Sequence, residues 1–573
     1  MKNLNRSGAA ACSFLLAMTV IAGCTTEVQE QAQPSAVHQT RAELAAAYNT
    51  KLVEDRSVYE QDKADEVVNF YLTVAEHNLT SEHPLSWKQF NAINRLEQNT
   101  EDKTLEVVLQ EGTEKGPESG KFGFGETHAN GVISIRGKST IKANQKSFKI
   151  KLFDEAGLWR NQRTINLVKH AFDSTRLRNK LSFDYFTMIP DFTSLRTQFV
   201  HLYVKDLTAG GNAGYVDYGL YTQIEQPNKT FLKSHGLDSN GHLYKASRFE
   251  FLRYPDALKT TNDPTYDEKK FNEVLEPKGS MDHEKLLLML DDVNDLSLPF
   301  DQVFDKYFDR DNFLTWMAVN ILMDNFDTIN QNFLLYSPLN SDKWFFLPWD
   351  YDGAWGDTDF DEESAERRAP WQRGISNYWG NTLQSRFFKN PDNVQALRDK
   401  IDELQKIINP EQTAKMIETY RPIVSEFVHR EPDLVDLPDP ISIYESVLDK
   451  MKPLSELNEQ RFIEMLEQPM PFFMGDVKRK NNTFTFVWGV SYDLQGDDLT
   501  YRYQLAKNPS FSNPIKDITL TGVSVEVEGL PKGKYFWKVT AKDSKGHEVP
   551  AFDSYEDVES DHYFGVRVFY VDE

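Results

Sequence analysis

Short apolar and alternating runs dominate the first part of the chain and predict β-strands. They recur between polar turns at residues 67–74, 104–109, 132–136, 148–153, 197–205 and 218–225, a pattern typical of half-buried strands. Segment 173–188 differs, because its apolar residues recur at helical spacing behind Asp173, a candidate N-cap. We therefore expect a sheet with one inserted helix. The run GKFGFGETHANG, between two of the strands, reads as a hairpin loop or a glycine-rich flap.

The middle of the chain is predicted to be mainly helical. Two strands, at 332–336 and 344–348, interrupt the helices, and segment 236–280 shows no regular pattern. Together with the strands before it, this order predicts an α+β fold. The expected helices lie at 41–62, 228–234, 282–294 and 310–324, with two or three more between 382 and 468.

The last hundred residues return to short alternating strands, which predict a separate all-β domain over 472–573. The strands read FTFVWGV, LTYRYQLA, VSVEVE and YFWKVTAKD, and turn signals recur at short spacing between them. The run from Gly533 to Asp543 resembles the tryptophan strand of a fibronectin type III-like β-sandwich. Such domains usually bind or space, and the fold alone supplies no chemistry.

Composition and charge exclude some classes of protein. The 573 residues are 40% hydrophobic and 27% charged, which is a globular composition. The net charge of −24 argues against a sequence-independent nucleic-acid binder, since such a protein needs a basic field. The two cysteines, Cys12 and Cys24, are too few for a disulfide framework or a cysteine-rich zinc site.

The N-terminus reads as a targeting segment. A basic start, a short apolar run and small residues before Cys24 predict a signal peptide over residues 1–23. The Ala-Gly-Cys ending resembles a bacterial lipobox, in which Cys24 is lipidated, although an ordinary signal peptide cut nearby is the alternative. Thr25 follows Cys24 in place of Asp, which in a Gram-negative host favours the outer membrane or cell surface. Residues 24–45 predict a disordered tether, so the lipid is the only expected membrane contact.

The candidate chemistry lies in the middle of the chain. Asp327 and Asn332 are five residues apart, as in the D-x-x-x-x-N catalytic loop of protein kinases. There the aspartate takes the proton of the acceptor hydroxyl and the asparagine holds a metal ion. After one strand pair, Asp350 stands in Trp-Asp-Tyr-Asp-Gly, where kinases place the metal-binding aspartate of D-F-G. Each signal alone is weak. A helix, a polar loop, a strand pair and then Asp-x-Asp-Gly, in this order, together predict phosphoryl transfer.

Strand 148–153 and the residue before it supply candidate cations. Ser147, Lys149 and Lys151 share one face by period-two alternation. Ser-Phe-Lys matches the end of the kinase V-A-I-K motif, which favours Lys149 over Lys151 as the phosphate-binding lysine. The alternative is that both lysines only solvate an edge strand. Further on, residues 224–226 join a strand to a helix where a kinase hinge offers backbone groups to adenine.

At this point the sequence resembles the spore-coat protein H (CotH) kinase family. The resemblance extends over about residues 65–465 and rests on five runs in order: Arg136-Gly-Lys-Ser-Thr, Lys146-Ser-Phe-Lys-Ile-Lys-Leu, Leu177-Arg-Asn, Gly219-Leu-Tyr-Thr-Gln-Ile-Glu and Pro348-Trp-Asp-Tyr-Asp-Gly. It implies an atypical protein-kinase-like two-lobed fold over 46–468, with an N-lobe at about 65–226 and a C-lobe at about 227–468. The implied activity is phosphorylation of Ser/Thr in secreted or surface proteins with ATP and Mg²⁺ or Mn²⁺.

The resemblance also implies roles for individual residues. Asp327 would be catalytic. The metal would be held by Asp350, Asn332 and Asp352, and ATP would be bound by Arg136, Lys149, Lys151 and Glu225. The chain departs from the family pattern in Lys138, where asparagine is expected, and from protein kinases in Asn325-Phe326 before the catalytic aspartate. Because helix 173–188 has no obvious glutamate to pair with Lys149, we expect Glu225 or Asp352 to position that lysine.

Other readings stay open. The main alternative is a catalytically inactive, kinase-like surface adhesion or assembly lipoprotein, which the tether, lipid and terminal sandwich would equally fit. Residues Asp357, Asp359 and Asp361 match the start of an EF-hand loop, but Glu362 replaces the required glycine. A metal hydrolase is disfavoured because no histidine cluster has ligand spacing. Phe313, Trp316 and Met317 are expected in the core.

Overall fold

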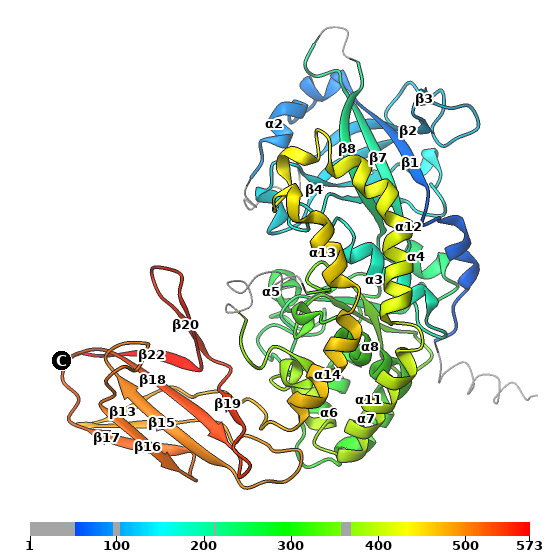
Figure 1. The fold of residues 1–573 in the computed structure, drawn as a ribbon. Helices are drawn as coiled ribbons and strands as arrows, with labels where there is room; N and C mark the ends of the chain where they lie inside the picture. The colour runs from blue at the N-terminus through cyan, green and yellow to red at the C-terminus, as the bar shows by residue number, and fades with distance from the viewer. Residues whose placement is uncertain (1–51, 95–102, 211–213, 357–367, 573) are drawn as a thin grey trace, which may run out of the picture. The chain divides into compact units, whose positions relative to one another are not determined.

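An eight-stranded sheet forms the first part of the fold. The computed structural model describes residues 52–94, 103–210, 214–356 and 368–572 (Figure 1). Strand order in the sheet is β1-β7-β8-β6-β5-β4-β2-β3, and β1 also pairs with β2, so the sheet closes on itself. β1 and β7 are parallel and the other pairs are antiparallel. The strands are β1 Val67–Val74, β2 Leu105–Thr113, β3 Gly116–Pro117, β4 Gly131–Arg136, β5 Ser147–Leu152, β6 Thr164–Val168, β7 Thr197–Asp206 and β8 Val216–Glu225.

The alternation predicted for β5 is confirmed. Phe148, Ile150 and Leu152 are buried in the core of this sheet, whereas Lys149 and Lys151 are exposed. The six strands expected from the alternating runs are all present, with ends that differ by a few residues. β6 was not predicted. The glycine-rich run 120–131 connects β3 to β4, as a loop between two strands.

The inserted helix, α3 Arg178–Met188, begins five residues later than predicted. Asp173 is not its N-cap, since that position belongs to Leu177. The Asp173 carboxylate instead accepts hydrogen bonds from the backbone N–H groups of Thr175 (2.9 Å) and Arg178 (3.1 Å), and it forms an ion pair with the Arg178 guanidinium at 2.7 Å. Asp173 therefore caps the turn before the helix.

Helices and a second, four-stranded sheet make up the next part. Sheet order is β10-β9-β11-β12. From Asn312 onward α8 is buried on all sides, and the expected core residues Phe313, Trp316 and Met317 are among its buried residues. The strands are β9 His242–Ala246, β10 Leu275–Pro277, β11 Phe333–Ser337 and β12 Phe345–Pro348. The helices are α2 Trp87–Asn91, which lies in the first part, and α4 Lys229–Ser234, α5 Glu268–Val274, α6 Glu284–Asn294, α7 Phe300–Tyr307, α8 Arg310–Leu322, α10 Thr382–Phe387, α11 Pro391–Leu404, α12 Pro410–Val428, α13 Tyr444–Met451 and α14 Leu454–Leu466.

Three predictions for this half of the chain need correction. Segment 236–280 is not irregular, because it contains β9, α5 and β10. β9 is only five residues long and is fixed by pairing with both β10 and β11, so its own sequence gives little periodic signal. Five helices, not two or three, lie between 382 and 468. Of the helix expected at 41–62, the described part contains only a 3₁₀ turn, Arg56–Gln61.

The C-terminal residues form two sheets packed face to face. One sheet is β13-β14-β17 and the other is β16-β15-β18-β19, with β22 also paired to β18. Phe486 of the first sheet and Tyr503 and Trp537 of the second share one core, so the two sheets pack as a sandwich, and its fibronectin type III-like character stays a prediction. The strands are β13 Lys478–Lys480, β14 Thr483–Val487, β15 Thr500–Ala506, β16 Lys516–Leu520, β17 Ser524–Glu528, β18 Gly533–Lys542, β19 Glu548–Pro550 and β22 Val566–Val571, with a separate hairpin of β20 Ser554–Glu556 and β21 His562–Phe564.

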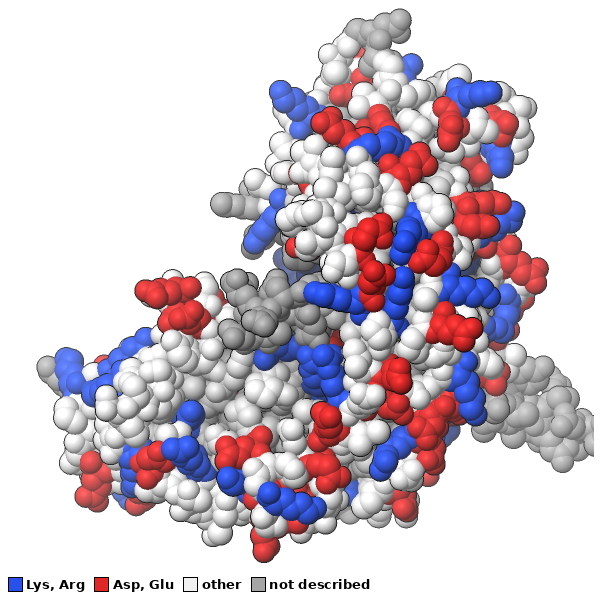
Figure 2. Space-filling model, in the orientation of Figure 1, with Lys and Arg blue, Asp and Glu red and all other residues white. Residues whose placement is uncertain are grey.

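Charge is mixed over the surface seen in Figure 2. Acidic and basic side chains alternate there at short range, so the net charge of −24 does not gather into one acidic patch on this face. Among the described residues, no helix has both the length and the apolar character needed to cross a bilayer.

The turn after α12 is anchored to the first sheet by a buried ion pair with the residue after β6 and by a hydrogen bond from β8. α12 runs beside β7 and β8 in Figure 1, and Asp433 follows it. The Lys169 ammonium lies 2.8 Å from the Asp433 carboxylate, which also accepts the Leu220 N–H at 2.9 Å. Both side chains are buried. Burial lowers the pKa of Lys169 to about 8, although Asp433 opposes the shift. The pair therefore fastens the end of α12 to the first sheet.

We expect the Asp433→Ala variant to lose about 3–5 kcal/mol of unfolding free energy, since it leaves a buried ammonium unpaired. Urea denaturation of the full chain measures the change. The double variant Lys169→Met/Asp433→Leu removes both charges and should recover most of the loss. Equal destabilisation by the single and double variants would contradict this view of the pair.

Candidate active site

The turn after α8 presents the first two site residues. Asp327 lies in a 3₁₀ turn, Phe326–Thr328, with φ −88° and ψ 21°, in the sparsely populated bridge region. Its carboxylate accepts hydrogen bonds from the Gln331 amide at 2.6 Å and from the Asn332 amide at 2.7 Å. Asn332 has φ +57°, which asparagine tolerates better than most residues. The pair picked out by its spacing of five is thus brought together.

The β11–β12 hairpin brings the second carboxylate loop to the same place. Phe333 pairs with Pro348, so the antiparallel register puts Asn332 and Trp349 at one end of the hairpin. Asp350 follows immediately, with φ +58°. A Cβ built on Gly353 would lie only 3.3 Å from the Asp327 Cβ. The 350–353 loop therefore packs directly against the turn that carries Asp327, and Asp327, Asn332, Asp350 and Asp352 are all half-buried.

α3 holds the 350–355 loop in place. The Tyr351 N–H donates to the Asn179 side-chain oxygen at 2.7 Å, and the Trp355 indole N–H donates to the Ser182 hydroxyl at 2.9 Å. The Tyr351 ring also packs edge-on against Phe186, with 5.3 Å between ring centroids. The helix contains no glutamate, and an amide and a hydroxyl provide its polar contacts to this loop.

Two half-buried cations flank Asp350. Arg136 ends β4, and its guanidinium lies 5.7 Å from the centroid of the Trp349 ring. The Lys245 ammonium, from β9, lies 4.9 Å from a ring centroid of the same residue. Burial lowers the pKa of both cations, and the Asp350 carboxylate opposes the shift in each. The site thus gathers two desolvated positive charges around one aromatic side chain and one acidic loop.

Lys245 is a site residue that sequence analysis missed. It stands in β9, inside the segment that was expected to be irregular, and it pairs with Leu334 of β11. Since β11 also pairs with β12, Lys245 lies one strand away from the hairpin that ends at Asp350. No motif marks it; only the pairing of β9 with β11 does.

The sheet register places the two predicted lysines at different distances along the Arg136 face. Arg136 pairs with Ser147, and directly opposite residues share a face, so Lys149 and Lys151 lie on the face of Arg136. At ~3.3 Å per residue, Lys149 is about 7 Å and Lys151 about 13 Å along β5 from Ser147. This spacing favours Lys149 of the two. Both lysines remain predictions as ATP-binding residues.

Glu225 points away from Lys149. It pairs with Ile165, whereas Lys149 pairs with Asn166, so period-two alternation puts the two side chains on opposite faces. The Glu225 carboxylate lies 2.9 Å from His235 Nε2, and His235 Nδ1 lies 3.0 Å from Glu54. All three side chains are buried. The expectation that Glu225 positions Lys149 is therefore not met.

Contacts from later in the chain hold the 323–332 turn. Arg368 forms two hydrogen bonds of 2.6 Å with the Asp324 carboxylate, and its guanidinium lies 5.0 Å from the Phe326 ring centroid. The Asn381 amide donates to the Ile329 carbonyl at 3.0 Å, and the Ile329 side chain packs against the hydrophobic cluster that joins Ala369 and Trp371 to the core of the C-terminal sandwich. This cluster links the turn that carries Asp327 to the sandwich.

Some predicted features lie outside the described residues. They are the signal peptide at 1–23, Cys24, the tether at 24–45 and the acidic run Asp357, Asp359 and Asp361. The structure therefore leaves the predictions for them as they were.

Comparison with known proteins gives a family match, and the individual matches include one curated protein and one solved structure. The model of the family described as CotH kinase protein matches residues 133–461. Inner spore coat protein H of Bacillus subtilis strain 168 is 24% identical over 322 residues, which cover 53% of this chain and 82% of that protein. The crystal structure of the Helicobacter pylori proinflammatory kinase CtkA matches at 11% identity over 60% of this chain and 95% of that one. Its TM-score of 0.22 is too low to support an argument about fold.

The buried cluster of His235, Glu225 and Glu54 makes the stability of the fold depend on pH. Burial alone would favour a neutral ring, but the Glu225 and Glu54 carboxylates raise the pKa of His235 to about 9. A raised pKa means that the stabilisation is complete below the unfolded value of about 6.5 and is lost as pH rises through about 9. We expect the unfolding free energy to fall between these two pH values. The His235→Gln variant, compared by urea denaturation across the same range, should lack this component of the slope.

The two half-buried cations, Arg136 and Lys245, predict binding of a polyanion. Inorganic tripolyphosphate with Mg²⁺ should raise the melting temperature of the full chain, and saturation at 100 Kd corresponds to about 2.7 kcal/mol. Arg136→Ala and Lys245→Ala should each remove most of this rise, because each deletes one of the two desolvated charges. Lys205→Ala, which removes one positive charge from β7, is the matched control. If Lys205→Ala weakened binding as much as Lys245→Ala, the effect would come from net charge and not from the site.

Proposed function

The chain belongs to the CotH kinase protein family, whose model covers more than half of it, and from this premise we propose an atypical protein kinase. In this proposal it transfers the γ-phosphoryl group of ATP to Ser or Thr of a secreted or surface protein. The observation that carries the proposal is the contact between two loops: Asn332 donates to Asp327 at 2.7 Å, and Gly353 of the Asp-Tyr-Asp-Gly run packs on Asp327. A turn and a hairpin separated in sequence thus present their carboxylates together.

Asp327 is proposed to orient the acceptor hydroxyl and accept its proton. The amide groups of Gln331 and Asn332 hold both of its oxygens, so the carboxylate has a fixed direction. Positioning of this kind supplies much of the rate in phosphoryl transfer, where the protein does little covalent chemistry. A hydroxyl that approaches Asp327 would replace one of these amide contacts.

Asp350, Asn332 and Asp352 are proposed to hold Mg²⁺ or Mn²⁺. All three offer oxygen ligands, the preference of hard divalent cations. Asn332 can serve two purposes, because its NH₂ group bonds Asp327 and leaves the amide oxygen for the metal. A bound ion would neutralise charge on the phosphates. The fit rests on the donor set and on the half-buried position of the three residues.

Arg136 and Lys245 are proposed to bind the phosphates. Their charges are desolvated beside the Trp349 ring, and a charge acts more strongly in such surroundings than in water. Lys149, on the same face as Arg136, extends this set along β5. The backbone of residues 224–226 remains the proposed adenine contact, although the Glu225 carboxylate belongs to the His235 cluster.

The order of parts supports a kinase-like arrangement with two lobes. A glycine-rich loop precedes β4, a lysine-bearing strand β5 follows, and then come helix α3, the Asp327 turn and the Asp350 loop. Protein kinases place their glycine-rich loop, lysine, αC helix, catalytic loop and D-F-G in this order. The eight-stranded sheet and the helical part each have a hydrophobic core cluster, as two lobes would require.

The proposed location is the outer membrane or cell surface, with the lipid on Cys24 as anchor. The sequence features of the N-terminus support it, and the matched Bacillus relative is described as a spore coat protein. The alternative function is a catalytically inactive surface adhesion or assembly protein. The C-terminal sandwich supports that alternative, because domains of this architecture typically bind other molecules.

Asp327→Asn and Asp350→Asn should each lower phosphoryl transfer by at least about a hundredfold, since general-base and charge-stabilising groups contribute at this scale. The assay is transfer of labelled γ-phosphate from ATP with Mn²⁺ to a Ser/Thr peptide mixture and to the chain itself. Asp402→Asn, an exposed carboxylate of α11, is the control and should act as wild type.

Unchanged melting temperatures would show that the inactive variants are folded. Labelling by either site variant at the wild-type rate would contradict the site. A wild-type protein that ATP does not stabilise, and that transfers no label, would favour the inactive alternative.

A further inference from the structure

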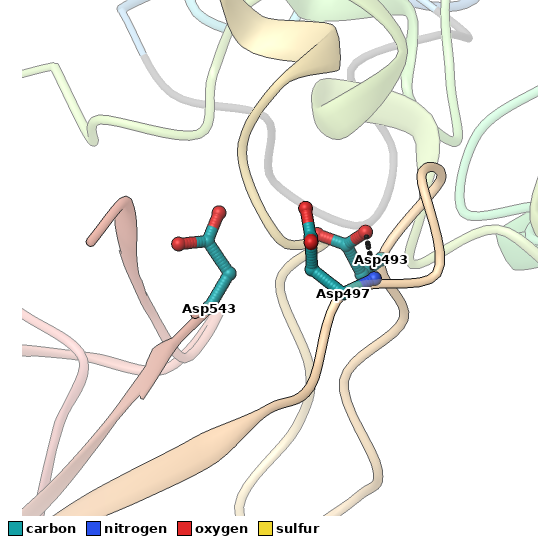
Figure 3. Close-up of side chains that lie close together, drawn as sticks. All are labelled: Asp493, Asp497 and Asp543. Carbon is teal, nitrogen blue, oxygen red and sulfur yellow. Dashed lines mark hydrogen bonds between the residues drawn. The ribbon is translucent and has the colours of Figure 1, made fainter. Parts of the chain in front are cut away.

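Three aspartates meet at one end of the C-terminal sandwich. Asp493 and Asp497 belong to the loop between β14 and β15, and Asp543 follows β18 (Figure 3). One carboxylate oxygen from each lies within 4.8 Å of the other two. Asp493 is 7% exposed and Asp543 is 4% exposed, so most of the charge lies away from solvent. None of these residues belongs to the proposed kinase site.

Asp493 has an unpartnered oxygen inside this cluster. Its Oδ1 accepts the backbone N–H groups of Gln495 at 2.9 Å and Asp497 at 2.8 Å. Its Oδ2 is buried and makes no hydrogen bond to any described residue. In Figure 3 the hydrogen-bonded oxygen faces the Asp497 nitrogen, and the other is turned toward the remaining carboxylates. A buried carboxylate oxygen without a partner is costly, and a cation held among the three carboxylates would satisfy it.

The charges around the cluster do not balance. The Lys545 ammonium lies 2.9 Å from Asp497 Oδ2, but its side chain is half exposed. His547 Nδ1 lies 2.7 Å from Asp543 Oδ2. Three carboxylates therefore share one lysine, at the edge of the site, and one histidine.

We propose that Asp493, Asp497 and Asp543 bind Ca²⁺. The offered ligands are oxygens, which suit a hard cation, and the neighbouring His547 nitrogen is already engaged by Asp543. Ca²⁺ accepts irregular sets of six to eight oxygens, whereas Mg²⁺ demands a near-ideal octahedron and keeps several waters. Lys545 occupies the mouth of the cluster and has to move aside when the ion enters.

The calcium site would order the β14–β15 loop, through which the sandwich contacts the helices. In the same loop, the Gln495 amide donates to the Leu466 carbonyl at 2.9 Å, at the end of α14. The Tyr492 ring stacks on Trp379 with 5.5 Å between centroids, and its hydroxyl donates to the Lys389 carbonyl at 3.1 Å. Ca²⁺ would thus stabilise the contact between sandwich and helices without touching the proposed catalytic metal site.

The test is a Ca²⁺ titration of the full chain, followed by melting temperature and by calorimetry. We expect a saturable rise for the wild type. Asp493→Asn should weaken Ca²⁺ binding by about tenfold or more, because ligand charge sets the affinity. Asp498→Asn, an exposed neighbour outside the cluster, is the matched control. Asp350→Asn should bind Ca²⁺ as the wild type does in this cluster, which separates this inference from the proposed kinase site.

Lys545→Met provides a second, independent variant. Removing the competing ammonium should tighten Ca²⁺ binding several-fold, and this holds even if Asp493→Asn fails to fold. A wild type that shows no calcium-dependent rise, or equal Ca²⁺ affinity in the wild type, Asp493→Asn and Lys545→Met, would overturn the proposal.

Discussion

The hydrogen bond between Asn332 and Asp327 is the contact on which the active-site account depends. It joins the turn after α8 to the start of the β11–β12 hairpin, whose second strand leads to Asp350 at the same end. Without it, a carboxylate in an irregular turn would have no fixed direction relative to the second acidic loop. The small Gly353 then lets the second loop close on Asp327. Every proposed chemical role requires this approach of two loops.

Charge is arranged around that contact in a way that favours a polyanion with a metal ion. Half-buried carboxylates lie on one side, and Arg136 and Lys245, both desolvated, lie beside Asp350. Neither the carboxylates nor the two cations are stable alone in these surroundings, because desolvated charges need partners. A divalent ion would complete the first set and a phosphate chain the second. The three aspartates of the sandwich differ from this site, because among the described residues no comparable pair of half-buried cations lies beside them.

Sequence reasoning reached the local features and missed those that depend on pairing between distant segments. The alternation of β5 and the spacing of Asp327 and Asn332 are both local, and both were predicted. Lys245 escaped notice because β9 is a strand only through its neighbours β10 and β11. Glu225 was placed near Lys149 by order along the chain, but a register difference of one residue turns its side chain to the opposite face. The packing of Ile329 against the cluster that joins Ala369 and Trp371 to the sandwich likewise has no signal in the local sequence.

The most direct measurement of the central claim is anomalous diffraction from crystals soaked with Mn²⁺ and a non-hydrolysable ATP analogue. The account predicts a manganese peak within coordinating distance of Asp350 and the Asn332 amide oxygen, with the phosphates directed toward Arg136 and Lys245. The Asp327 carboxylate should face the terminal phosphate. A nucleotide bound elsewhere, or manganese bound without Asp350, Asn332 or Asp352, would contradict it.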